Sequence, residues 1–159
     1  MLDTALRWLE DSSWAVAIRQ STWIYPALEI VHITGIVVLV GPALMFDLRL
    51  LGFAKKLPIA TLGDHLLQWS RRGLILVVPS GLMLFISNAS TLGYDPVFWL
   101  KMLLLLVAGL NALVFHRFTF RVKNSSNEIM AISTGSKLAA IISIIVWLSV
   151  ITCGRLLAY

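Results

Sequence analysis

Four long apolar stretches dominate the chain, and short segments with charged residues, proline or glycine separate them. They cover roughly residues 23–51, 66–86, 97–118 and 138–157. Each is close to the ~20 apolar residues that cross a bilayer as a helix. The chain is 58% hydrophobic and 13% charged, whereas soluble domains average about 25% charged residues. The pattern predicts an all-α fold, an integral membrane four-helix bundle over residues 23–159.

Residues 1–22 form a separate segment in which apolar and charged positions recur with helical spacing. Its apolar positions include Leu2, Leu6 and Leu9, and two tryptophans, Trp8 and Trp14, lie among them. Tryptophan favours the boundary between membrane and water, and an apolar stripe beside charged residues is typical of a helix that lies in that boundary. We expect an N-terminal interfacial amphipathic helix ahead of the bundle.

Positive charge is distributed unequally between the two sides of the expected bundle. The formal net charge is +5, and nine of the 13 Lys and Arg residues flank the loops after the first and third stretches. These nine are Arg49, Lys55, Lys56, Arg71, Arg72, Arg117, Arg121, Lys123 and Lys137. Basic loops stay in the cytoplasm, so we expect a multi-pass protein of a bacterial inner membrane with both termini periplasmic. Because the charges lie at the ends of apolar runs, they indicate membrane orientation and no nucleic-acid binding.

The first apolar stretch contains two ionisable residues, Glu29 and His32. Such groups are costly inside a bilayer, usually face the interior of a bundle and often mark a functional site. Gly35 lies one helical turn after His32, where its missing side chain would let a flat ligand approach the imidazole. Neutral imidazole is the commonest metal ligand among side chains. We expect His32 to bind the iron of haem b; the alternative is a hydrogen bond from His32 to a neighbouring helix.

Depth in the bilayer selects the residues expected beside His32. At about 1.5 Å of rise per residue, His32 lies roughly 12–14 Å below the outer end of its helix. Lys101, Met83 and Met102 belong to the same half of the bundle by this measure. Any of the three can supply a second axial ligand, or the iron stays five-coordinate. Lys101 lies nearer the outer surface, where we expect it to meet a haem propionate.

The other two histidines, His65 and His116, lie near the cytoplasmic ends of their helices. One interpretation is that both are solvated residues at the membrane boundary. The alternative is a second haem, or a pocket for a quinone head group in which Arg49, Arg71 and Arg72 polarise a carbonyl or neutralise carboxylates.

Several short motifs occur in a fixed order along the helices. They are His32-x-x-Gly35, Asp47-Leu48-Arg49-Leu50-Leu51-Gly52, Trp69-Ser70-Arg71-Arg72-Gly73, Pro79-Ser80-Gly81-Leu82 and Asp95-Pro96-Val97-Phe98-Trp99-Leu100-Lys101. Over nearly the whole chain this order resembles a family of small uncharacterised bacterial four-helix membrane proteins. It is more distantly similar to the HemJ-type protoporphyrinogen oxidases. That similarity implies haem b on His32 and functional roles for Arg49 and Lys101, although Gly135-Ser136-Lys137 replaces the Asn-Glu-Pro that opens the last helix of those oxidases.

Three functions fit these observations. The first is a haem b protein that passes electrons between a redox partner and quinone, either alone or as a homo-oligomer, with the cofactor supplying the chemistry. The second is a HemJ-like porphyrinogen oxidase, and the third is a cofactor-free accessory subunit of a larger membrane complex. The sequence does not decide whether the protein is an enzyme. The single cysteine, Cys153, excludes an intramolecular disulfide and a cysteine-based metal motif.

Overall fold

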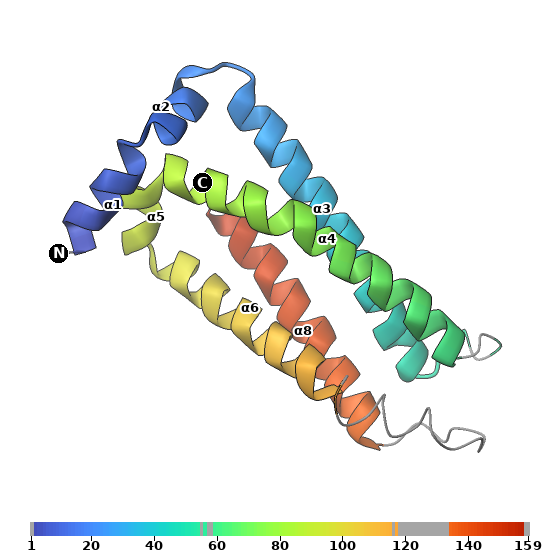
Figure 1. The fold of residues 1–159 in the computed structure, drawn as a ribbon. Helices are drawn as coiled ribbons and strands as arrows, with labels where there is room; N and C mark the ends of the chain where they lie inside the picture. The colour runs from blue at the N-terminus through green and yellow to red at the C-terminus, as the bar shows by residue number, and fades with distance from the viewer. Residues whose placement is uncertain (1, 55, 57–58, 116, 118–133, 158–159) are drawn as a thin grey trace.

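The computed structural model describes residues 2–54, 56, 59–115, 117 and 134–157, and within them it contains helices and no strand. The helices are α1 (Leu2–Glu10), α2 (Ser13–Gln20), α3 (Ile24–Leu50), α4 (Ile59–Ser87), α5 (Ala89–Tyr94), α6 (Pro96–Val114) and α8 (Thr134–Leu156) (Figure 1). Four of them, α3, α4, α6 and α8, are long and apolar enough to cross a membrane. The all-α prediction with four spans is therefore confirmed, and the apolar surfaces of these helices indicate a bilayer environment.

Local hydrogen bonds explain where two of the helices end or begin. At the end of α3, Gly52 adopts a φ of 104°, which favours glycine. The N–H groups of Phe53 and Gly52 then donate to the carbonyls of Leu48 and Arg49, so the end of the helix is closed by its own backbone. At the start of α6, Oδ1 of Asp95 accepts a hydrogen bond from the N–H of Val97 at 2.7 Å, as an N-cap does.

Two elements differ from the sequence prediction. Lys55, Lys56, Pro58 and Gly63 predict a loop over residues 52–64, but α4 begins at Ile59. One glycine inside a helix costs only about 1 kcal/mol, which the rest of a long helix easily offsets. Residues 89–94 were expected in a polar turn and form the short helix α5.

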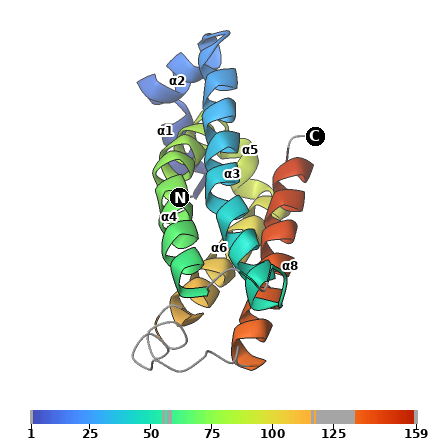
Figure 2. The same ribbon diagram turned by 90° about the vertical axis from the view of Figure 1, so that its right-hand side faces the viewer.

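The four long helices are arranged as two pairs (Figures 1 and 2). α3 packs along α4, α6 packs along α8, and α3 also contacts α8, whereas α4 packs against neither α6 nor α8. We call the end of the bundle where α3 begins and α8 ends the terminal end, and the opposite end the loop end. Phe46, Leu50 and Ala140 form a buried cluster that joins α3 to α8 toward the loop end.

Glycine and serine allow α3 and α4 to approach closely. A Cβ atom at Gly73 would lie 2.6 Å from the backbone nitrogen of Leu39, too close for any side chain. Beside this crossing, Oγ of Ser70 donates a hydrogen bond to the carbonyl of Leu39 at 2.6 Å. Small residues that let backbones approach are a common basis of helix packing in membranes, so this crossing fixes the first pair.

The N-terminal helices α1 and α2 pack at the terminal end, against α5 and α4. Leu6 is buried and fills the space that a side chain at Gly93 would occupy. Trp8, Trp14 and Trp23 are 75%, 71% and 80% exposed, as expected for tryptophans in contact with the membrane boundary.

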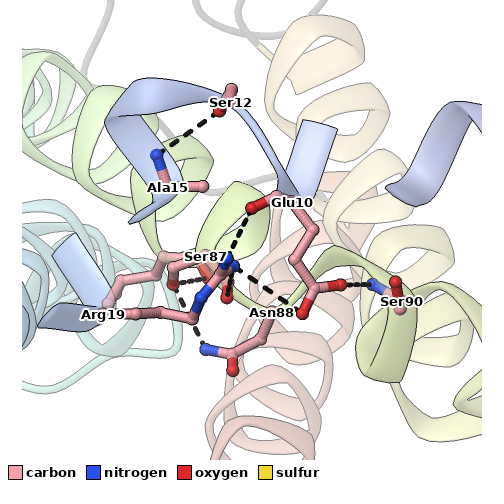
Figure 3. Close-up of polar contacts among 8 residues, drawn as sticks. Glu10, Ser12, Ala15, Arg19, Ser87, Asn88 and Ser90 are labelled. Atoms are coloured by element: carbon pink, nitrogen blue, oxygen red, sulfur yellow. Dashed lines mark hydrogen bonds and ion pairs between the residues drawn. The ribbon is translucent and has the colours of Figure 1, made fainter. Parts of the chain in front are cut away.

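Charged groups also attach these helices to the turn between α4 and α5, in a set of contacts that we call the Glu10–Arg19 clasp (Figure 3). Arg19 donates to the carbonyl of Ser87 at 3.0 Å and to the carbonyl of Glu10 at 2.7 Å. The Glu10 carboxylate accepts from the backbone N–H of Ser90 at 2.9 Å and lies 3.7 Å from Arg19. Hydrogen bonds from Ser90, followed by the charges of Arg19 and Arg7, lower the pKa of Glu10 from its ordinary value of 4.5.

Candidate functional site

His32 extends from α3 toward α4, in the part of the bundle nearer the terminal end. Its Nδ1 atom lies 2.9 Å from Oγ of Ser80 on α4, and Ser80 is buried. The Ser80 hydroxyl also donates to the carbonyl of Leu76, one turn back on its own helix. Within the described residues Nε2 has no hydrogen-bond partner. The hydrogen bond from His32 to a neighbouring helix, which was the alternative to haem ligation, is therefore present; haem ligation through the other ring nitrogen stays a prediction.

Two glycines lie around the imidazole, and the structure gives them different roles. A Cβ atom at Gly81 would lie 3.0 Å from Cε1 of His32, so Gly81 provides the space for the ring. Gly35 was expected to provide that space. A Cβ atom there would instead lie 2.8 Å from Cγ2 of Val77 and 2.9 Å from Cβ of Leu76. The interpretation of Gly35 as clearance for a ligand is therefore wrong, because α4 fills the position and Gly35 serves helix packing.

Lys101 enters the same region from α6. It lies close enough for its charge to act on His32 and on the Cys153 thiol. Its Nζ atom lies 4.0 Å from the position that a Cβ atom of Gly154 would take on α8. His32 of α3 and Ser80 of α4 are in direct contact, whereas Lys101 of α6 and the buried Cys153 of α8 lie within range of electrostatic interaction.

Among the described residues, neither of the two methionines nor Glu29 makes a hydrogen bond to the His32 imidazole. Met83 is 38% exposed, Met102 is partly buried and Glu29 is exposed. The role of a methionine as axial ligand stays a prediction. Glu29, three residues before His32, can orient the imidazole, carry a proton or be an outer-surface carboxylate, and these alternatives stay open.

The residues expected near the loop end are scattered. Arg49 and Asp47 are buried, and the Asp47 carboxylate contacts Ser143 on α8 through one oxygen. Within the described residues its other oxygen, Oδ2, has no hydrogen-bond partner. Arg72 lies over the ring of Trp69 at 4.9 Å from the centroid, a cation–π contact at the surface.

Of the remaining residues expected there, Arg71 and His65 are exposed, as a solvated boundary position requires. His116, Lys55, Arg121 and Lys123 lie outside the described residues. Among the described residues of this set, Arg49 is buried whereas Arg71, Arg72 and His65 are exposed.

The sequence predicts that Pro79 to Gly81 lie on a helix facing His32 and open a slot for the porphyrin. It predicts neither the hydrogen bond from His32 to Ser80 nor a place for Cys153 in the site. Gly81 and Ser80 belong to the Pro79-Ser80-Gly81 motif, which predicted a kink of α4. The helix continues through Pro79 to Ser87, and the kink itself stays a prediction. Nothing in the apolar pattern indicates which face of α4 meets α3, so no signal identified Ser80 as the partner of His32.

Comparison with known proteins places the chain in a family. No curated protein and no solved structure matches it, so the similarity to HemJ-type oxidases stays an interpretation of the sequence. A family profile matches residues 6–159, which include all seven described helices except the first residues of α1. The chain therefore belongs to the family of unknown function DUF6644.

Proposed function

We propose that this protein binds haem b in a bacterial inner membrane and passes electrons between a redox partner and quinone. His32 is the iron ligand, and it binds through Nε2. The observation that carries the proposal is the state of this side chain: a histidine inside a span, fixed through one ring nitrogen to Ser80 on the neighbouring helix, while the other nitrogen has no partner among the described residues.

The residues around His32 fit a haem. Imidazole nitrogen is the usual axial ligand of haem iron in membrane and soluble electron carriers, and the group supplies reversible one-electron chemistry when bound. The positive charge of Lys101, near His32, suits a propionate. Among the described helices α4 packs against neither α6 nor α8, and we propose that the haem lies between these helices beside the imidazole.

Arg49 supports the quinone part of the proposal. It is the one arginine among Arg49, Arg71 and Arg72 that is buried. Its side chain is buried toward the loop end, where a guanidinium can polarise a quinone carbonyl. The exposed positions of Arg71 and Arg72 suit lipid head groups or water instead.

Positive charge supports an orientation with the loop end in the cytoplasm and both termini in the periplasm. A C-terminal alkaline phosphatase fusion is then active and a C-terminal GFP fusion is dark. The reverse pair of results would overturn the orientation and reverse the sides at which donor and quinone are expected.

The proposal is tested by purifying the protein from cells with ample haem and recording its absorption spectrum. A Soret band, with sharper bands that appear on reduction, is the expected result. A protein that purifies folded and colourless under these conditions contradicts the proposal.

One observation favours a second candidate, the cofactor-free accessory subunit. Among the four spans, α6 is the least buried, and most of its large side chains face outward, including Leu103, Leu106 and Leu110. Such a face can pack on another membrane subunit as well as on lipid. A colourless protein that co-purifies in stable stoichiometry with a larger complex would make this the better account.

A further inference from the structure

The hydroxyl of Ser80 determines which nitrogen of His32 carries the proton. A serine hydroxyl has one proton and two lone pairs. Ser80 directs its proton to the carbonyl of Leu76, so it can only accept from the imidazole. The ring atom at 2.9 Å is Nδ1, which must therefore be the protonated nitrogen of a neutral ring.

The surroundings of the ring favour the same assignment. Nδ1 faces α4, because a Cβ atom at Gly81 would lie 3.5 Å from Nδ1 and 4.0 Å from Nε2. The backbone of Val77, the other hydrogen-bond partner of the ring, also belongs to α4, and its carbonyl lies 3.3 Å from Oγ of Ser80. Both partners thus belong to α4, and the only ring nitrogen with a resolved side-chain hydrogen bond among the described residues is Nδ1.

We infer that Ser80 is a positioning residue that holds His32 in the Nδ1–H tautomer, so that Nε2 is the only ring nitrogen able to bind a ligand. The role of this tautomer in binding haem iron rests on the proposed function. The hydrogen bond at the second nitrogen fixes the tautomer and orientation of a metal-binding histidine and raises its basicity. Because Ser80 lies on α4 and His32 on α3, the packing of these two helices also fixes the orientation of the His32 imidazole.

The tautomer can be measured without any cofactor. The probe is protein labelled with 15N-histidine, prepared free of haem and carrying His65→Gln and His116→Gln, so that His32 gives the only imidazole signals. Long-range 1H–15N correlations distinguish a protonated from an unprotonated ring nitrogen. A protonated Nδ1 and an unprotonated Nε2 are expected; a dominant Nε2–H tautomer overturns the inference.

Ser80→Ala in the same background removes the acceptor and should shift His32 toward a mixture of tautomers. Ser149→Ala is the matched control, because Ser149 makes the same kind of hydrogen bond, to the carbonyl of Ile145 at 2.9 Å, and makes no hydrogen bond to a histidine among the described residues. It should leave the spectrum unchanged. If Ser80→Ala does not fold, Ser80→Thr keeps the hydroxyl and should keep the Nδ1–H tautomer. An unchanged tautomer in folded Ser80→Ala protein contradicts the role of Ser80.

Haem titration separates this inference from the proposed function. Loss of such a supporting hydrogen bond typically weakens metal binding about 10–100-fold, so Ser80→Ala should raise the dissociation constant for haem by about tenfold and Ser149→Ala should not. A protein with the expected tautomer that binds no haem refutes the proposed function and leaves the role of Ser80 intact. Haem bound with equal affinity by Ser80→Ala and wild type refutes the role of Ser80 and leaves the proposed function intact.

Discussion

The Glu10–Arg19 clasp and the His32–Ser80 contact both join helices through polar side chains. They differ in how many of their hydrogen-bonding atoms have a partner within the protein. In the clasp, both Glu10 oxygens and both terminal nitrogens of Arg19 have partners within the chain. His32 uses one ring nitrogen. A polar group whose capacity is satisfied internally supports the fold. A half-buried group inside a span with an unused lone pair is suited to a ligand, and this difference directs attention to His32.

Neither region contributes much to the free energy of unfolding. The clasp lies outside the spans, where water screens ion pairs to roughly 0–1 kcal/mol. Hydrogen bonds between membrane helices average about 0.6 kcal/mol, so the His32–Ser80 contact contributes little stability. The close approach of α3 and α4 around Gly73 and Leu39 contributes more, because it sets the position of every residue on both helices.

The largest effect is expected where this approach is blocked. Gly73→Ala would place a Cβ atom 2.6 Å from the nitrogen of Leu39, and since a backbone cannot move aside locally, α3 and α4 must separate. Overpacking costs about 1–3 kcal/mol or more, and the yield of folded monodisperse protein in detergent should fall sharply. Gly109→Ala, with nothing within 4 Å, is the control and should be as stable as wild type. Equal melting temperatures for the two variants would refute this packing.

The next largest effect is expected from a change near His32 that leaves the imidazole itself intact. Lys101→Ala removes the positive charge expected to hold a propionate, and a hydrogen bond to a charged group contributes about 1.5–3 kcal/mol. Haem affinity should fall at least tenfold while the protein stays folded. Lys137→Ala, an exposed lysine in the first turn of α8, is the matched control. Haem affinity that depends equally on both lysines would remove Lys101 from the site.

The smallest effect is expected in the clasp, and it depends on pH. Because the folded-state pKa of Glu10 lies below 4.5, its ionised form is stabilised by folding. This contribution is complete above the ordinary pKa and is lost as the pH falls through the lowered folded-state value. Glu10→Gln should therefore flatten the decline in melting temperature between about pH 5 and pH 3, and it should leave haem binding unchanged. Identical pH profiles for wild type and variant would show that the clasp does not stabilise the carboxylate.

Different parts of the molecule could be predicted from the sequence to different extents. The four spans follow from bilayer thickness, which demands long apolar helices wherever a chain crosses. His32 was identified because an ionisable residue at that depth needs a partner. Helix pairing could not be predicted, since apolar residues surround each span on all sides and give no preferred face. Gly35 shows the consequence, because a glycine beside a neighbouring helix and a glycine beside a ligand look the same in sequence.

The most direct test of the central claim compares His32→Ala with His65→Ala in otherwise identical preparations. Both remove one imidazole, but His65 is an exposed residue near the start of α4, whereas His32 lies inside a span with Nε2 unused. The measurement is haem per protein, from the Soret absorbance of membrane-extracted, monodisperse protein. The account predicts that His32→Ala loses the Soret band and that His65→Ala keeps it at the wild-type intensity. A His32→Ala protein with an unchanged Soret band would contradict the account.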